Sequence, residues 1–148
     1  MATKILVLNG PVLNMLGVRQ PKIYGRETLA QVEADCRKQA RRLGVGLDFR
    51  QSNHEGELVD WFLKARGKYS CLIVNAAAYT HTSVAILDAL LAAEVPTIEV
   101  HISHILKREP FRQRSYVSEA AVGLISGFGT YGYQLAIEAA ARMAARAS

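Results

Sequence analysis

Short apolar runs that end in polar residues are the feature that most constrains how this chain folds. Four such runs span residues 5–8, 45–49, 71–74 and 97–98, and segments with helical spacing separate them. Alternation of this kind is typical of a parallel sheet, in which all strands end at one edge. We therefore expect the polar residues after the runs to meet there as an active site; they lie at 9–11, 51–55, 75–83 and 99–103.

The first helical segment carries both a start signal and a stop signal. Thr28 and Gln31 have the spacing of a capping box, and Gly44 is the residue type that commonly ends a helix. The apolar residues between them fall on one face, which predicts that this face packs on the sheet. They are Leu29, Val32, Cys36, Ala40 and Leu43.

Two more helices are predicted before the fourth apolar run. Ser52 and Glu55 have capping-box spacing and predict the start of the first of them. Its inward residues are expected to be Leu58, Phe62 and Ala65. The second is expected to start at about Thr82. Its inward residues are expected to be Val84, Leu87 and Leu91.

The remaining segments complete a single α/β domain. Residues 13–25, which include Gly17, Pro21 and Gly25, are predicted to lack regular structure, and so is the basic connection 106–118. A fifth strand is predicted at 122–125 and a final helix from about Tyr131. We expect residues 1–148 to form one flavodoxin-like, three-layer domain with a five-stranded parallel sheet.

Composition narrows the classes of partner. The 148 residues carry a formal net charge of +5, which favours acidic partners, and a small anionic substrate explains that balance. The basic residues are not interleaved with aromatic ones, so a nucleic-acid site is not expected. No apolar stretch approaches the length of a membrane span, and no signal pattern precedes the first strand. Cys36 and Cys71 lie among apolar residues, typical of buried thiols, and we expect a cytoplasmic protein.

Arg19 and Tyr24 lie in the glycine-containing segment after the first strand. A segment of this kind can close over a ligand. A nearby cation favours the phenolate form of tyrosine, so Tyr24 beside Arg19 is a candidate general base. The non-functional alternative is that Arg19 is simply solvated and that Tyr24 packs on the protein surface.

Glu99 and His101 are two residues apart and so share a face of their strand. A carboxylate beside an imidazole orients the ring and raises its basicity, which suits a general acid near neutral pH. The simpler alternative is that Glu99 and His101 form a hydrogen-bonded pair that serves only packing. The following Ile102 and Ser103 offer backbone N–H groups and a hydroxyl at the strand end, suitable for a carboxylate.

The other polar residues have both structural and binding interpretations. Thr80, His81 and Ser83 could bind a ligand or simply cap the next helix. Asn75 follows a buried run directly and is expected to face the cleft. One member of the basic cluster is expected to bind an anion. That cluster consists of Arg108, Arg112 and Arg114.

Residues 127–132 match the glycine spacing of a dinucleotide-binding turn. The match is weak, because it lies at the end of the chain and leaves no room for the next strand and its acidic residue.

Taken in order, the motifs resemble those of the type II 3-dehydroquinate dehydratases along essentially the whole chain. They are Leu8–Pro11, Asn14, Arg19, Tyr24–Gly25, Gln51–Glu57, Tyr79–Val84, Ile98–Ser103, Arg108–Glu109, Phe111–Arg112 and Ser115–Tyr116.

The resemblance implies loss of water from 3-dehydroquinate to give 3-dehydroshikimate, in the shikimate pathway or in quinate breakdown. It implies no metal or organic cofactor. Tyr24, with Arg19, would remove the C2 proton, and His101, held by Glu99, would protonate the departing hydroxyl. The substrate-binding residues would be Asn75, His81, Ile102, Ser103 and Arg112. Asp88 would help complete a neighbouring subunit's site in a dodecamer built from trimers.

Two departures from the family pattern leave alternatives open. Val12 stands where the family has an asparagine that orients a water on the enolate oxygen, and Ala76-Ala77 replaces the usual proline- or glycine-containing step. A weakly active paralogue therefore remains one alternative. The other is a flavodoxin-like binding module, although Asn9–Val12 is a poor phosphate cradle.

Overall fold

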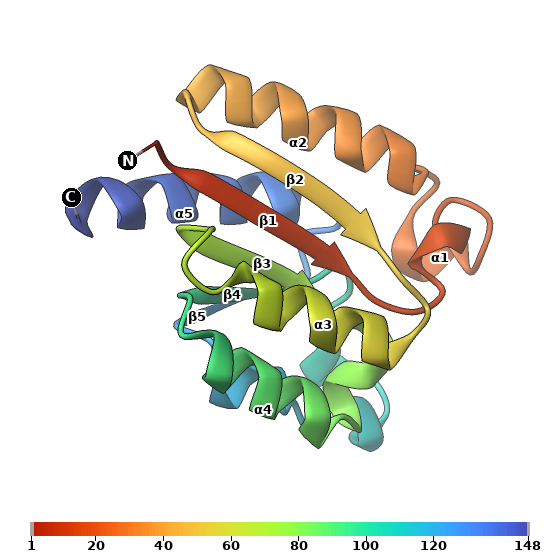
Figure 1. Ribbon diagram of the computed structural model, residues 1–148. Helices are drawn as coiled ribbons and strands as arrows, with labels where there is room; N and C mark the ends of the chain where they lie inside the picture. Colours follow the sequence, from red (N-terminus) through yellow and green to blue (C-terminus); the bar gives the residue numbers. More distant parts are fainter. Residues whose placement is uncertain (1, 148) are drawn as a thin grey trace.

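Five parallel strands form one sheet in the order β2-β1-β3-β4-β5. The computed structural model describes residues 2–147 (Figure 1). The strands are β1 (Lys4–Asn9), β2 (Gly46–Gln51), β3 (Cys71–Asn75), β4 (Thr97–His101) and β5 (Gly123–Ser126). This order is the flavodoxin-like winding, so the predicted fold class is confirmed.

Four long helices cover the two faces of the sheet. They are α2 (Leu29–Leu43), α3 (Glu55–Ala65), α4 (Val84–Ala93) and α5 (Tyr131–Ala147). Helices α2 and α5 pack together on one face, and α3 and α4 pack together on the other (Figure 1). No helix within residues 2–147 is long and apolar enough to cross a membrane.

The strand residues alternate between two apolar cores. In β1, Ile5 and Val7 pack into the core under α2 and α5, while Leu6 and Leu8 pack into the core under α3 and α4. All four are nearly inaccessible to solvent. Because both faces are covered, the central strands β1 and β3 contain continuous apolar runs rather than alternating ones. Cys36 and Cys71 are free, buried thiols, as expected.

Helix α2 follows its predicted signals closely. Thr28 and Gln31 form the reciprocal capping box, and Gly44 ends the helix in the left-handed region at φ 71°. Helix α3 does not follow its predicted cap. His54 is its N-cap residue, and the Ser52 hydroxyl instead accepts a hydrogen bond from the His54 backbone N–H at 3.0 Å.

The predicted inward face of α4 is wrong. Val84 and Leu91 are 50% and 56% exposed, whereas Ile86, Ala89 and Leu90 are buried. The helix is apolar almost all the way round, so two different faces fit helical spacing equally well. Tertiary packing against α3 therefore decides which face is buried.

The two segments predicted to be irregular contain short helical turns. Residues 13–15 form a 3-10 turn, and α1 (Pro21–Tyr24) is a single α-helical turn that begins with proline. The connection after β4 is a series of 3-10 turns at 105–107, 110–112 and 117–119. Each turn is only three or four residues long, too short to leave a periodic signal in the sequence.

Gly10 marks the closest approach between the ends of β1 and β3. Its N–H donates to the Asn75 carbonyl at 2.8 Å. A Cβ at Gly10 would lie 2.3 Å from the Ala76 carbonyl oxygen, which is backbone and cannot rotate away. This contact brings the loop after β1 against the end of β3.

We expect Gly10→Ala to lower the free energy of unfolding by about 1–3 kcal/mol, the usual cost of forcing an extra methyl group into a packed site. Gly56→Ala is the matched control, because Gly56 lies inside α3 and a Cβ added to it would meet nothing within 4 Å. Alanine there favours the helix, so stability should rise by about 0.5–1 kcal/mol. Urea unfolding measures both; equal effects of the two substitutions would contradict the close approach.

Candidate active site

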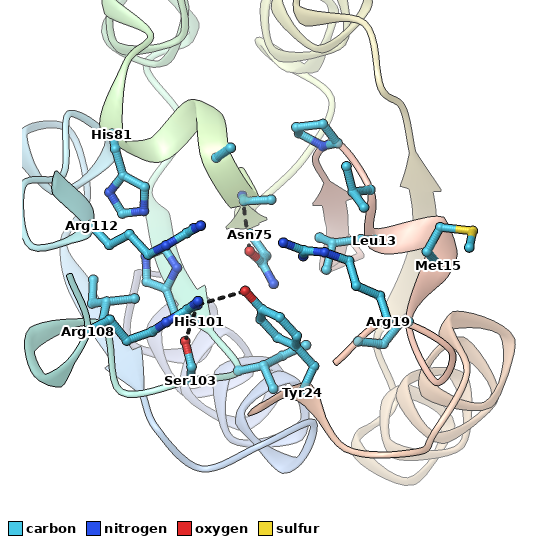
Figure 2. A pocket seen from close by; sticks show the side chains of 17 residues that line it. Leu13, Met15, Arg19, Tyr24, Asn75, His81, His101, Ser103, Arg108 and Arg112 are labelled. Atoms are coloured by element: carbon cyan, nitrogen blue, oxygen red, sulfur yellow. Dashed lines mark hydrogen bonds between the residues drawn. The ribbon is translucent and has the colours of Figure 1, made fainter. Parts of the chain in front are cut away.

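A pocket lies at the carboxyl edge of the sheet, over the ends of β1, β3 and β4 (Figure 2). Eight of the ten residues predicted for the site line it: Arg19, Tyr24, Asn75, His81, His101, Ile102, Ser103 and Arg112. They come from segments that are far apart in sequence, which meet because the parallel strands all end at this edge. Glu99 and Asp88 do not line it.

Tyr24 lies between two guanidinium groups. It is the last residue of α1, and Gly25 follows at φ 83°. The Cζ atoms of Arg19 and Arg108 lie 5.2 and 5.3 Å from the centroid of the Tyr24 ring. Arg108 Nη1 also donates a hydrogen bond to Tyr24 Oη at 2.7 Å. Two positive side chains therefore face Tyr24, and one of them contacts its oxygen directly.

The contact from Arg108 is the functional feature that the sequence does not reveal. Sequence places the residue only in a cluster of three arginines, one of which is expected to bind an anion, without showing which. Arg108 is 84 positions from Tyr24, and its surroundings in sequence are those of a solvated loop. In the structure its side chain is only 14% exposed, and its Nη1 also donates to Ser103 Oγ at 3.3 Å.

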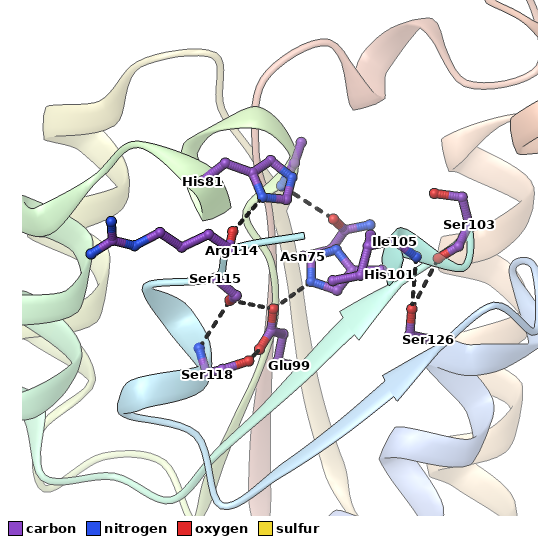
Figure 3. A network of polar contacts seen from close by, with 11 residues as sticks. Asn75, His81, Glu99, His101, Ser103, Ile105, Arg114, Ser115, Ser118 and Ser126 are labelled. Carbon is purple, nitrogen blue, oxygen red and sulfur yellow. Dashed lines mark hydrogen bonds and ion pairs between the residues drawn. The ribbon is translucent and has the colours of Figure 1, made fainter. Parts of the chain in front are cut away.

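His101 and Glu99 form a hydrogen-bonded pair at the end of β4 (Figure 3). The contact joins His101 Nε2 to Glu99 Oε2, and both side chains are 5% exposed or less. Ser115 Oγ donates to Glu99 Oε2 at 2.7 Å, and Ser118 Oγ donates to Glu99 Oε1. Three donors therefore surround one buried carboxylate behind the pocket wall.

Those donors keep Glu99 ionised. Burial by itself raises the pKa of the Glu99 carboxyl. The hydrogen bonds from His101 and the two serines outweigh burial, so its pKa lies below the ordinary value. An ionised Glu99 can only accept, so the His101 Nε2 that faces it carries a proton.

His81 stacks beside His101 and has a defined tautomer. The two ring centroids lie 6.4 Å apart with nearly parallel planes. Burial lowers the pKa of His81 below its ordinary value, which favours the neutral ring near pH 7. Its Nδ1 lies 2.7 Å from the Arg114 carbonyl oxygen, which only accepts, so Nδ1 carries the proton and Nε2 is left as an acceptor.

The polar cluster after β2 supports the pocket from outside rather than lining it. Asn53 Oδ1 accepts from the Val12 N–H at 2.9 Å and from Gln51 Nε2 at 3.0 Å. Gln51 Nε2 also donates to the Gly10 carbonyl at 3.1 Å. The expectation that all four polar clusters meet in the site is therefore wrong for this one, because β2 is the edge strand.

The two departures from the family pattern occupy unusual backbone positions. Val12 and Ala77 have φ of 69° and 51°, in the left-handed region that non-glycine residues seldom adopt. Both line the pocket. The Ala77 N–H donates to Asn75 Oδ1 at 3.2 Å, so a side chain of the site holds this turn.

The remaining predicted residues have clear positions. Arg112 Nε lies 3.1 Å from Glu109 Oε2 at the mouth of the pocket. Ser83 caps α4 by accepting from the Ile86 N–H at 2.9 Å, so the structural interpretation holds for it. Asp88 is exposed on α4, away from this pocket. Among residues 2–147, no group of three or more His, Cys, Asp or Glu side chains could hold a metal ion.

Comparison with known proteins identifies the family. A family model described as dehydroquinase class II matches residues 3–141. The "3-dehydroquinate dehydratase 2" of Agrobacterium fabrum is 58% identical over 142 residues, which are 96% of this chain and 97% of the relative. The protein of the same name from Pseudomonas putida is 56% identical over 133 residues, 90% of this chain and 89% of the relative.

Solved structures agree with the sequence matches. The crystal structure of type II dehydroquinase from Propionibacterium acnes is similar with a TM-score of 0.92 and 42% identity, covering 96% of this chain and 98% of that one. A 3-dehydroquinate dehydratase-like protein from Bifidobacterium longum has a TM-score of 0.71 and 31% identity, covering 97% and 98%. With its fold and nearly its full length matched, this chain belongs to the type II dehydroquinase family.

Proposed function

We infer that this chain is a 3-dehydroquinate dehydratase, which converts 3-dehydroquinate to 3-dehydroshikimate and water. The observation that carries the inference is a pair of proton-transfer groups in one pocket, Tyr24 and His101, each held by a charged partner. An elimination of water next to a ketone needs a base and an acid of this kind. The relatives that match nearly the whole chain bear this enzyme's name.

Tyr24 acts as the base in this proposal. Its phenolate oxygen removes the proton from C2 of the substrate, and the electron pair of that C–H bond moves into the C3 ketone to give an enolate. Arg108, which contacts the oxygen, and Arg19, which lies over the ring, stabilise the phenolate before the proton arrives. The pocket would lower the barrier because the positive charges of both arginines are in place before the reaction starts.

His101 acts as the acid. When the enolate returns to the ketone, a double bond forms between C1 and C2 and the bond from C1 to its hydroxyl breaks. The departing hydroxyl takes a proton from His101 and leaves as water. Because Glu99 occupies Nε2, the other ring nitrogen, Nδ1, is the one that exchanges protons with the substrate.

The other pocket residues hold the substrate. Its carboxylate binds to the backbone N–H groups of Ile102 and Ser103, and Arg112 adds positive charge nearby. A ring hydroxyl can donate to the acceptor nitrogen of His81, Nε2, and accept from Asn75. The positive charge of Arg19, Arg108 and Arg112 around the pocket suits an anionic substrate.

The direct test is turnover of 3-dehydroquinate by the purified protein, followed by the absorbance of the conjugated product. Tyr24→Phe should lower kcat by about 10²- to 10⁴-fold, the usual contribution of a positioned base. Tyr69→Phe is the matched control, because it removes a tyrosine hydroxyl at the amino end of β3, away from the pocket.

The assay separates the proposed function from its two alternatives. A folded wild-type protein that binds 3-dehydroquinate without turnover would support a binding module. Weak turnover that Tyr24→Phe leaves unchanged would remove Tyr24 as the base. Loss of turnover in Tyr69→Phe as well would show that the assay reports folding rather than catalysis.

Val12 gives a second prediction, about rate. Valine lacks the amide that would orient water on the enolate oxygen, and loss of one such donor costs about 10²–10³ in kcat. Val12→Asn should therefore raise kcat more than it changes KM, because the ketone needs little stabilisation before it becomes an enolate. Asparagine also tolerates the left-handed backbone of this position (φ 69°), so the variant should unfold at a higher urea concentration.

Val122→Asn is the matched control for that variant. Val122 is 62% exposed and lies just before β5, outside the pocket, so the same substitution there should leave kcat unchanged. An unchanged or lower kcat in Val12→Asn would mean that another group stabilises the enolate. A higher kcat in both variants would contradict the proposal that the asparagine amide at position 12 acts by orienting water on the enolate oxygen.

We propose that the chain assembles into a dodecamer of trimers in which Asp88 helps complete the site of a neighbouring subunit. Asp88 is exposed on α4, and Val84 and Leu91 on the same helix are at least half exposed, an apolar surface suited to contact with another subunit. Asp88 is absent from the lining of its own chain's pocket, as expected if it acts across an interface.

Light scattering should therefore report a particle near twelve times the 16.2 kDa chain. Asp88→Asn should lower kcat without changing that mass, because it removes the charge and keeps the shape. Glu94→Gln, at the exposed end of the same helix, is the control that should leave kcat unchanged. A fully active monomer would remove Asp88 from the site and overturn the assembly proposal.

A further inference from the structure

Four hydrogen bonds form a chain from the Ala77 backbone through Asn75 in the pocket and the fully buried Tyr133 of α5 to β2. Asn75 Nδ2 donates to Tyr133 Oη at 2.8 Å, and Tyr133 Oη donates to Asn9 Oδ1 at 2.7 Å. At one end the Ala77 N–H donates to Asn75 Oδ1 at 3.2 Å, and at the other Asn9 Nδ2 donates to the Arg50 carbonyl at 3.1 Å. Asn9 and Tyr133 are 0% exposed and Asn75 is 4% exposed.

The two backbone groups at the ends fix the direction of every bond between them. The Ala77 N–H can only donate, so the atom of Asn75 that faces it is the oxygen. The Arg50 carbonyl can only accept, so the atom of Asn9 that faces it is the nitrogen. Tyr133 is left between an amide nitrogen and an amide oxygen, and a hydroxyl can accept from one and donate to the other.

We propose that Tyr133 is a positioning residue for the dehydratase reaction, one that locks the Asn75 amide so that it offers an N–H donor to the substrate. One N–H of Asn75 Nδ2 is used by Tyr133, and the second is the group that faces a ligand in the pocket. The substrate group at this point must then be an acceptor such as a hydroxyl oxygen. The identity of the substrate in this proposal rests on the proposed function, whereas the hydrogen-bond network does not.

Tyr133 suits this task because its buried hydroxyl contacts both amides, accepting from Asn75 and donating to Asn9. The ring is packed in the core under α2 and α5, with the Phe49 ring 6.4 Å from it, centroid to centroid. The hydroxyl therefore has a fixed position, unlike a serine or a water at the same place. Phenylalanine keeps the packing and removes only the hydroxyl, leaving two buried amides without their shared partner.

The kinetic test compares Tyr133→Phe with the wild-type enzyme on 3-dehydroquinate. We expect KM to rise about 3- to 10-fold, the factor for losing one positioned hydrogen bond, with a smaller change in kcat. A substrate hydroxyl remote from the reacting carbons contributes to binding in the ground state and the transition state alike. An unchanged KM in the folded variant would overturn the proposal.

Two controls separate positioning from a general loss of stability. Tyr69→Phe removes the partly buried hydrogen bond between Tyr69 and Asp48 at the opposite end of the sheet, so it should lower stability and leave KM unchanged. Tyr133→Phe added to Asn75→Ala should raise KM no further than Asn75→Ala alone. An equal rise in KM in Tyr69→Phe, or an additive rise in the double variant, would count against the proposal.

A third measurement uses only the wild-type protein without substrate, so it does not depend on whether a variant folds. In nuclear magnetic resonance spectra of the ligand-free wild-type protein, we expect slow solvent exchange for both side-chain N–H protons of Asn9 and for one of the two of Asn75. Fast exchange of all these protons would overturn the network even in an active enzyme. If the network is present and the protein has no turnover, the failure belongs to the proposed function instead.

Discussion

The parallel alignment of β1 with β3 is the constraint on which the rest of the site depends. It places Asn9 directly opposite Asn75 at the ends of the two strands, and Gly10 then runs against the backbone of Ala76. Strand β4 follows in the same direction on the other side of β3 and delivers His101 to the same edge. No loop has to be stretched or bent to gather these groups, because the sheet itself brings them together.

The two residues proposed to transfer protons lie on different kinds of support. His101 ends β4 within the sheet, and Glu99 behind it is surrounded by donors from the turns at 115–118. Tyr24 ends α1, a single helical turn in the segment after β1. Asn75, like His101, ends a strand. In the proposed mechanism the acid therefore belongs to the sheet and the base to a connecting segment.

Sequence reasoning is most reliable where local and tertiary effects agree. The capping box at Thr28, the stop at Gly44 and the apolar strands can all be predicted, because each is set within a few neighbouring residues. The inward face of α4 cannot, since Val84 and Ile86 are equally apolar and only packing distinguishes them. Arg108 escapes prediction for the same reason: its contact with Tyr24 spans 84 positions. Tyr133 looks like one more core aromatic, because the partners of a buried hydroxyl leave no pattern in sequence.

The shared nitrogen of Arg108 has a consequence for how the pocket wall is held together. A single atom, Nη1, contacts Tyr24 on α1 and Ser103 just after β4, so it joins the segment after β1 to the segment after β4. A substitution that shortens this side chain would remove both contacts at once. One arginine thus couples the shape of this wall to the charge that faces the phenol oxygen.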